Sequence, residues 1–198
     1  MEAVDKKFNP KRADNITQAA YLSIVEHGFC EVTTQMIAGR AGVSKSMIHY
    51  YFADKDSLVT EVARMVMERL METISEVMDR YPTREEKIDK GITELWEAFT
   101  KEQGMWIVVY ESAINGRRIP QIRENLVDFY RELLSRITET IFPTEEVGEE
   151  VSARDAEAMA AIFSATIDSF IFHYLIDPEA TDFTHALEML KRLARAVP

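Results

Sequence analysis

Residues 33–55 read TTQMIAGRAGVSKSMIHYYFADK, and this stretch decides the fold of the first quarter of the chain. Thr33 and Thr34 are residue types that begin helices, and Gly42, eight residues further on, is a type that ends them. Ser44 then begins a second short helix. Two helices of about two turns, joined by a tight glycine turn, predict a helix-turn-helix.

Apolar and polar side chains of this stretch separate onto two faces. The predicted inward set is Ile37, Ala38, Ala41, Val43 and Ile48. The predicted outward set on the second helix is Lys45, Ser46, Met47, His49 and Tyr50. Outward donors at the start of such a helix suit base edges and phosphates in the DNA major groove. An ordinary helical hairpin with a solvated basic face would show the same periodicity, so periodicity alone leaves the two interpretations even.

The segments on either side also have helical patterns. One predicted helix, Arg12–His27, ends at Gly28, and a longer one begins after Asp54 and runs to about Tyr81. Further helices are expected at about 84–102, 104–115, 118–142, 152–176 and 182–196. The fold class is therefore all-α with about nine helices. We expect two domains, a three-helix DNA-binding domain over 1–53 and a helical domain over 54–198 that begins with a connecting helix, 54–81.

Charge is divided unevenly along the 198 residues. The net charge is −11, yet the first 55 residues have seven basic and six acidic side chains, so all the net acidity follows them. Phosphate contacts need Lys and Arg, so only the first quarter suits nucleic acid. No apolar leader opens the chain, and the longest unbroken apolar run near its middle, Met105–Tyr110, is far shorter than the roughly 20 residues of a membrane helix. We expect a cytoplasmic protein without a membrane partner.

The sequence lacks the patterns of catalytic and metal sites. Its one cysteine, Cys30, excludes an intramolecular disulfide and a cysteine-based zinc site. The four histidines have no partners at metal-ligand spacing, and no phosphate-binding glycine loop or nucleophile elbow occurs. We expect no enzyme activity, no metal and no cofactor.

The motif Thr-Thr-x-x-Ile-Ala-x-x-Ala-Gly-Val-Ser-x-x-x-x-x-Tyr-Tyr-Phe-x-x-Lys closely resembles the DNA-binding segment of the tetracycline-repressor (TetR) family of bacterial regulators. The similarity covers about residues 12–60. The neighbourhoods of Trp96–Phe99 and Ile167-Asp168 are weakly similar to the betaine-regulator branch of that family.

The resemblance implies which residues contact DNA. Lys45, Ser46 and Met47 would face bases, while the hydroxyls and imidazole around them would meet phosphate or sugar. The full set is Thr33, Thr34, Gln35, Lys45, Ser46, Met47, His49, Tyr50, Tyr51 and Lys55. Tyr51 has a structural alternative, which is to pack inside the domain.

The resemblance also implies a homodimer that releases double-stranded operator DNA when a small-molecule effector binds. Two-fold symmetry would place the recognition helices about 34–36 Å apart. Apolar residues on the last two helices, beyond what a small bundle needs, predict the dimer interface Met159, Phe163, Phe183, Leu187 and Leu190. The predicted effector site is Trp96, Phe99, Trp106, Tyr110, Ile167, Phe170 and His173. If the flanking Glu111 and Asp168 both face inward, the site would prefer a cation held by aromatic faces.

The function expected from the resemblance is a ligand-responsive transcriptional regulator, usually a repressor, that binds a palindromic operator. Aromatic residues at helical spacing are also typical of an ordinary core, which is the alternative for each residue of the predicted effector site. A protein–protein adaptor built on a former DNA-binding fold is the rival for the chain as a whole. An activator with the same DNA-binding domain is a third possibility.

Overall fold

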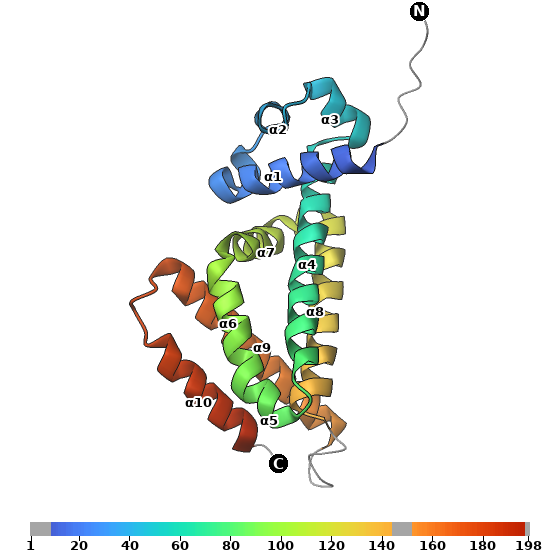
Figure 1. Ribbon diagram of the computed structural model, residues 1–198. Coiled ribbons are helices and arrows are strands. Elements are labelled where there is room, and N and C mark those ends of the chain that lie inside the picture. Colours follow the sequence, from blue (N-terminus) through green and yellow to red (C-terminus); the bar gives the residue numbers. More distant parts are fainter. Residues whose placement is uncertain (1–8, 144–151, 197–198) are drawn as a thin grey trace, which may run out of the picture. The chain divides into compact units, whose positions relative to one another are not determined.

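The computed structural model describes residues 9–143 and 152–196, and every regular element in those ranges is a helix (Figure 1). The helices are α1 (Pro10–Glu31), α2 (Thr34–Ala41), α3 (Lys45–Tyr51), α4 (Lys55–Arg80), α5 (Arg84–Glu86), a π-helical segment η1 (Lys87–Gly91), α6 (Ile92–Lys101), α7 (Gln103–Asn115), α8 (Pro120–Ile141), α9 (Ala153–Ile176) and α10 (Phe183–Ala196). Since α5, η1 and α6 follow one another without a break, the described residues hold nine helical segments, as predicted.

The short helices begin and end at the predicted residues. The Thr33 hydroxyl accepts the Met36 N–H at 3.2 Å, and the Ser44 hydroxyl accepts the Met47 N–H at 3.3 Å. Each hydroxyl satisfies a backbone donor that a helix leaves without a partner in its first turn. Gly42 ends α2 with φ 65°, a left-handed conformation that glycine adopts at no steric cost.

Helix α1 is interrupted at Gly28 rather than ended there. Gly28 has φ 74° and ψ 166°, after which one further helical turn runs to Glu31. The predicted end at His27 therefore marks a break, because glycine takes the positive φ that reverses the chain locally but does not stop a new turn from forming. The break leaves the Phe29 N–H to be satisfied from outside the helix.

The chain divides into two compact units. The first consists of Met1–Met67 with Ile107–Leu126, and the second of Glu68–Trp106 with Val127–Pro198. In the first unit, α2 packs on α1 and α3 packs on α2, with Ile16, Ile24, Ile37 and Ile48 fully buried. The first unit thus contains α1, α2 and α3 together with the start of α4, most of α7, the α7–α8 turn and the start of α8.

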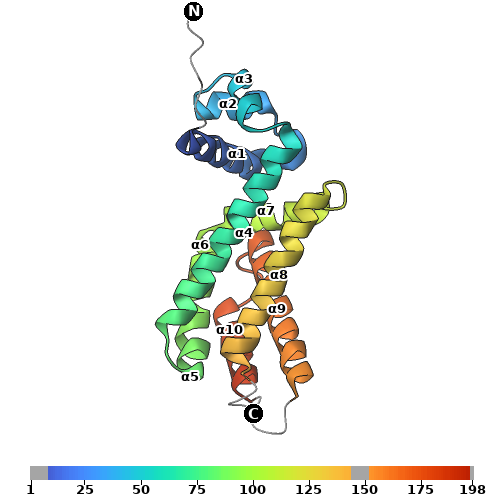
Figure 2. The ribbon, with the colours of Figure 1, turned by 90° about the vertical axis from the view of Figure 1, so that its right-hand side faces the viewer.

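The second unit is a helical bundle (Figure 2). In it, α9 and α10 pack against each other and α9 also packs against α6. The guanidinium of Arg84 joins two helix ends: Nε donates to the Ile141 carbonyl at 2.7 Å and Nη2 to the Ala194 carbonyl at 2.8 Å. Carbonyls in the last turn of a helix have no partner within the helix and attract positive charge. Arg84 therefore ties the ends of α8 and α10 together.

Among the described residues, one helix, α9, is long and apolar enough to cross a membrane by length and composition alone. Of its most apolar 18-residue stretch, 22% is buried inside the protein. The sequence predicts no such segment from the length of its unbroken apolar runs, because polar residues such as Ser164, Asp168 and Ser169 interrupt α9. A single helix of this kind is weak evidence for a membrane, since core helices pass the same test.

Replacing Arg84 with alanine should lower the free energy of unfolding by about 2 kcal/mol, because two carbonyl groups lose a charged donor. For a chain of this length that corresponds to a melting temperature lower by about 4–8 °C. Differential scanning calorimetry measures the change, and Glu85→Ala, an exposed position on the same helix, is the matched control. Equal melting temperatures for the two variants would show that this contact contributes nothing to stability.

Candidate nucleic-acid interface and ligand cavity

The outward face of α3 carries the residues predicted to meet DNA. Lys45, Ser46, His49 and Tyr50 are exposed, and Met47 is half-buried. Ile48 lies on the opposite face and is fully buried. A short helix with its apolar side fixed against the protein presents its polar side as a rigid surface, which is the arrangement that a recognition helix needs.

The start of α2 is placed for phosphate contact. Thr33 and Gln35 are exposed and Thr34 is half-buried. The side chain of Thr33 is engaged in capping, so its own contribution to phosphate binding would come from the remaining capacity of its hydroxyl and from nearby backbone N–H groups.

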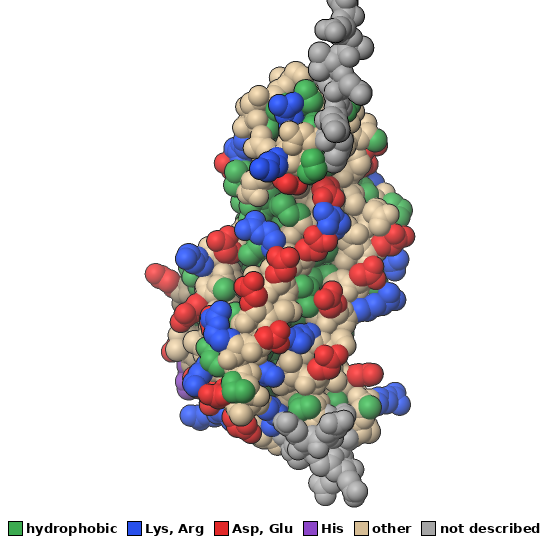
Figure 3. All heavy atoms as spheres, turned by 45° about the vertical axis from the view of Figure 1, so that its right-hand side comes forward, with side chains coloured by type: hydrophobic (Ala, Val, Ile, Leu, Met, Phe, Trp, Pro, Cys, Tyr) green, Lys and Arg blue, Asp and Glu red, His purple; other side chains and the backbone are tan. Residues whose placement is uncertain are grey.

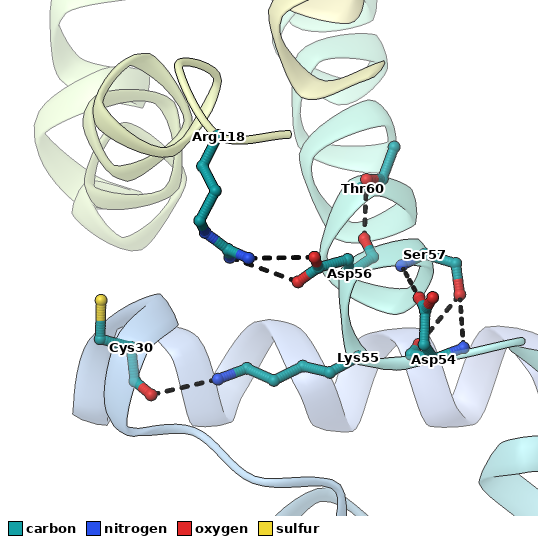
Figure 4. Close-up of polar contacts among 7 residues, drawn as sticks. All are labelled: Cys30, Asp54, Lys55, Asp56, Ser57, Thr60 and Arg118. Carbon is teal, nitrogen blue, oxygen red and sulfur yellow. Dashed lines mark hydrogen bonds and ion pairs between the residues drawn. The ribbon is translucent and has the colours of Figure 1, made fainter. Parts of the chain in front are cut away.

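Several of the predicted contact residues also have structural partners. Besides the capping Thr33, these are Ser46, whose hydroxyl lies 2.8 Å from that of Ser44, and Tyr51 and Lys55. The Tyr51 hydroxyl accepts the Asn9 N–H at 3.3 Å, and its ring meets Tyr50 edge-on with 5.1 Å between centroids. The Lys55 ammonium donates to the Cys30 carbonyl at 3.1 Å (Figure 4). Tyr51 therefore has contacts within the domain, as the packing alternative expects. Lys55 joins the end of α1 to the start of α4.

Charge on the body of the protein is mixed. On the face drawn in Figure 3, acidic and basic side chains are interspersed. Residues after 55 hold all the net negative charge. Of the basic side chains in α2 and α3, Arg40 is paired with Glu26, whereas Lys45 is exposed at the start of α3.

The second unit encloses a cavity between α4, α6, α7, α8 and α9. Its free volume is about 60 Å³, well below the roughly 300–1,000 Å³ of small-molecule sites, so a ligand of ordinary size would have to displace lining side chains. The lining is mostly apolar and includes the rings of Trp96, Phe99 and Trp106. The remaining lining residues are Ile74, Met78, Ile92, Leu95, Leu133, Arg136, Ile137, Thr140, Ile141, Phe163, Ser164, Ile167 and Asp168.

Asp168 brings an ionisable group to the cavity wall. Burial raises the pKa of its carboxyl group to about 6, while a hydrogen bond from the Tyr130 hydroxyl, 3.1 Å from Oδ2, acts in the opposite direction. The other charged lining residue, Arg136, is paired with Asp79 through one guanidinium nitrogen, while its buried Nε has no hydrogen-bond partner. At neutral pH the lining therefore includes a largely ionised carboxylate as well as three aromatic side chains.

Four of the seven predicted effector residues line this cavity, namely Trp96, Phe99, Trp106 and Ile167. The other three, Tyr110, Phe170 and His173, are not in its lining, and His173 is exposed. Glu111 does not face the cavity either, because its carboxylate accepts the Phe29 N–H in the first unit.

Sequence reasoning missed the polar lining residues Arg136, Thr140 and Ser164. Their types are common on solvated helix faces, so no signal in the sequence separates them from ordinary surface residues. Within residues 9–143 and 152–196, no three His, Cys, Asp or Glu side chains gather as a metal site requires.

An apolar groove runs over α9 and α10. Met159, Phe163 and Leu190 of the predicted dimer interface line it, whereas Phe183 and Leu187 do not. All of these except Met159 are buried in the single chain. The most exposed lining residues are Ile162 and Leu193, with 68% and 66% of their surfaces accessible. Apolar side chains of this size are seldom left so exposed over a contiguous surface.

Two family models together match most of the chain. Residues 16–62 match "Bacterial regulatory proteins, tetR family", and residues 66–197 match "BetI-type transcriptional repressor, C-terminal". Among similar proteins, the HTH-type transcriptional regulator BetI of Brucella anthropi is 26% identical over 188 residues, covering 93% of this chain and 92% of that protein. The BetI of Agrobacterium fabrum is 28% identical over 158 residues, covering 78% and 74%.

Solved structures share the fold. A TetR-family transcriptional regulator of Agrobacterium tumefaciens superposes with a TM-score of 0.75 at 19% identity, covering 96% of this chain and 99% of its own. FadR of Bacillus subtilis, solved in complex with stearoyl-CoA, has a TM-score of 0.72 at 20% identity, with 91% and 96% covered. The α2–α3 motif and the two family matches lead to one conclusion: the chain belongs to the TetR family of bacterial transcriptional regulators, with a C-terminal domain of the BetI type.

Proposed function

We propose that this regulator is a cytoplasmic repressor that binds a palindromic operator as a homodimer and leaves it when a small molecule enters the cavity of the second unit. The observation that carries the proposal is the exposed polar face of α3, which is supported from beneath by the buried Ile48. A separate apolar cavity with one carboxylate supports the response to a ligand.

The chemistry of α3 assigns roles to its exposed residues. The Lys45 ammonium is a donor for guanine O6 and N7, and Met47 offers only apolar contact, for example with a thymine methyl group. His49 and Tyr50 would donate to phosphates on either side. Base contacts of Lys45 and Met47 would set the operator sequence, and the phosphate contacts would set the register of α3 in the groove.

A second copy of the chain is the proposed occupant of the groove on α9 and α10. Ile162 and Leu193 would contribute the contact surface, and Met159, Phe163 and Leu190 would line the groove beneath them. An isologous two-fold contact buries the same apolar patch on both copies, and it supplies the symmetry that a palindromic operator requires. This assembly also gives the apolar surface of α9 a role that needs no membrane.

The proposed effector has an apolar body and a cationic group. Apolar lining over most of the cavity would bury the body, and Asp168 with Trp96, Phe99 and Trp106 would hold the cation. A fatty acyl group is the alternative, because FadR of Bacillus subtilis was solved with stearoyl-CoA. The carboxylate of Asp168 favours the cationic ligand, whereas the guanidinium of Arg136 in the same lining favours the acyl alternative.

Release follows if the ligand binds better to a conformation that does not fit the operator. A ligand shifts such an equilibrium only by the difference between its affinities for the two states. Helix α4 contributes residues to both units, so it is the proposed connection between the cavity and the DNA-binding helices.

Selection from a random duplex pool should enrich a palindromic sequence, bound with a steep dependence on salt concentration. Lys45→Ala and Tyr50→Ala should each weaken binding about 10-fold or more in anisotropy titrations, because each removes a contact to a base or a phosphate. Glu124→Ala, an exposed position on α8, is the control. The sample should first be unfolded and refolded to remove any bound ligand. No enriched sequence, or binding indifferent to both substitutions, would favour the protein–protein adaptor.

Ile162→Glu should weaken the dimer by a factor of about 30 or more, because it places a charge in the centre of an apolar interface. Sedimentation velocity over a range of concentrations measures the dissociation constant. The matched control is Ile114→Glu, since Ile114 is the same residue type with a similar exposed fraction, 69%, on α7. If both variants remain dimeric to the same extent as the wild type, the groove is not the interface.

Hexyltrimethylammonium should raise the melting temperature of the protein more than hexanoate or hexanol does. Asp168 is protonated below about pH 6, so cation affinity should rise as the pH increases from 5 to 7.5. In Asp168→Asn this pH dependence should disappear, as calorimetric titration would show. Stabilisation by hexanoate but not by the ammonium ion would contradict the cationic effector and support the acyl alternative.

The same carboxyl group should affect the stability of the unliganded protein. Its pKa is higher in the folded state than in the unfolded state, so its ionisation opposes folding. That cost is absent at pH 4 or below and fully present above about pH 6. Asp168→Asn should therefore stabilise the protein at pH 7.5, by about 1–2 kcal/mol at most, and should have little effect at pH 4. Equal effects at both pH values in urea unfolding would contradict this assignment.

A further inference from the structure

The turn between α7 and α8 is fastened to the DNA-binding helices at two points. At the first, the Glu111 carboxylate of α7 accepts the Phe29 N–H, with 3.4 Å between Oε2 and the nitrogen. This N–H follows the break in α1 at Gly28, so the carboxylate satisfies a donor that the interrupted helix leaves over. Gly28 also leaves room for the Glu111 carboxylate, because a Cβ on residue 28 would lie only 3.3 Å from Oε1 of Glu111.

The second point is an ion pair in which two guanidinium nitrogens of Arg118 donate to the two carboxylate oxygens of Asp56, at 3.0 and 3.3 Å (Figure 4). Asp56 lies in the first turn of α4, one residue after Lys55, whose ammonium holds the Cys30 carbonyl at the end of α1. The end of α1, the start of α4 and the α7–α8 turn are therefore joined to one another by three separate polar contacts.

The α7–α8 turn is built to hold these two side chains in position. Asn115 is buried, and its amide donates to Oε2 of Glu111 at 3.2 Å and to the Glu111 carbonyl at 2.8 Å. The Asn115 carbonyl accepts the Arg118 N–H at 2.9 Å. Gly116 leaves no room for a side chain, because a Cβ would lie 3.0 Å from the Ser112 carbonyl oxygen. One residue, Asn115, thus orients the carboxylate on one side and the backbone of Arg118 on the other.

We propose that Glu111 is a positioning residue for DNA binding, which fastens the α7–α8 turn to the break in α1 and so holds the platform on which α2 and α3 rest. The Arg118–Asp56 pair is the second fastening. Neither the Glu111 nor the Asp56 carboxylate is proposed to touch DNA. The inference rests on the proposed operator binding and adds to it the residues that set the orientation of the helix-turn-helix.

The contact is also suited to regulation. Helix α7 is continuous from Gln103 to Asn115, and it carries Trp106 of the cavity wall and Glu111 five residues later. A helix moves largely as a rigid rod, so a ligand that displaces Trp106 would strain the contact between Glu111 and Phe29. The same fastening that favours the DNA-binding state would then be the one that the effector weakens.

The direction in which Glu111→Ala changes DNA affinity distinguishes a positioning role from the general effect of removing a negative charge. Glu111→Ala removes a negative charge, and loss of a negative charge by itself favours binding to phosphates. The fastening predicts the reverse, an operator dissociation constant raised about 5- to 20-fold. Glu111→Gln keeps an oxygen acceptor for the Phe29 N–H and should stay within about 3-fold of the wild type. Glu124→Ala, which removes the same charge from an exposed position on α8, should leave binding unchanged or slightly tighter.

Hydrogen–deuterium exchange of the full-length dimer supplies a readout that does not depend on DNA. In Glu111→Ala the peptide that contains Phe29 should exchange about 10-fold faster, while Glu111→Gln should resemble the wild type. Arg118→Ala and Asp56→Ala should each weaken operator binding. The double variant should be weakened by less than the sum of the two single effects, since each substitution removes the same ion pair. The titrations use the operator selected above, with no effector added.

Each outcome decides between the two proposals. If the wild type selects no operator, the proposed function fails, and the positioning role falls with it. If the wild type binds its operator but Glu111→Ala binds equally well or more tightly, the positioning role alone is overturned. Faster exchange at Phe29 with unchanged operator affinity also overturns it, because the fastening would then exist without positioning the DNA-binding helices.

Discussion

The DNA-binding part of this protein depends on burial of a few apolar side chains beneath two helices that are too short to be stable alone. Helices of eight and seven residues are marginal in water, because nucleation costs more than so few hydrogen bonds return. Ile37 and Ile48 are completely buried, in one compact unit with the equally buried Ile16 of α1. That packing leaves the opposite face of α3 exposed and orients it, so the recognition surface follows from the core rather than from α3 itself.

The second unit contains a partly buried ionisable group, Asp168. There a carboxylate lies at the wall of an apolar cavity, and burial holds its pKa near the physiological range instead of well below it. A buried ionisable group costs free energy of folding, and this cost is consistent with the ligand-binding role proposed for the cavity. The proposed roles of the two units are thus separate: the first unit offers fixed donors to DNA, and the second offers a cavity with one adjustable charge.

The polar contacts around the α7–α8 turn include one that depends on the break in α1. Gly28 interrupts α1 and leaves a backbone donor over, and a carboxylate from α7, 82 residues later, accepts it. Exposed ion pairs such as Arg118–Asp56 contribute little stability on their own. Their value here is geometric, because together with Glu111 they define how the turn meets the helices that carry the recognition surface.

The sequence by itself determined the elements and the family. Hydroxyl caps at Thr33 and Ser44, the glycine turn at Gly42 and the 3.6-residue periodicity of α4 are local signals, so helix positions and the helix-turn-helix could be predicted to within a few residues. The exposed face of α3 followed from the same periodicity. The motif of residues 33–55 was dense enough to indicate the family before any fold was seen.

Only the tertiary structure decided which side chains meet. It brought Trp96, Phe99, Trp106 and Ile167 to one cavity but left His173 exposed, although all lie on helices at similar spacing. It turned Glu111 away from the cavity and toward the break in α1, and it added polar lining residues that no local pattern marks. The physical reason is that periodicity defines the face of a helix on which a residue lies, whereas the partner of that face depends on how distant segments pack.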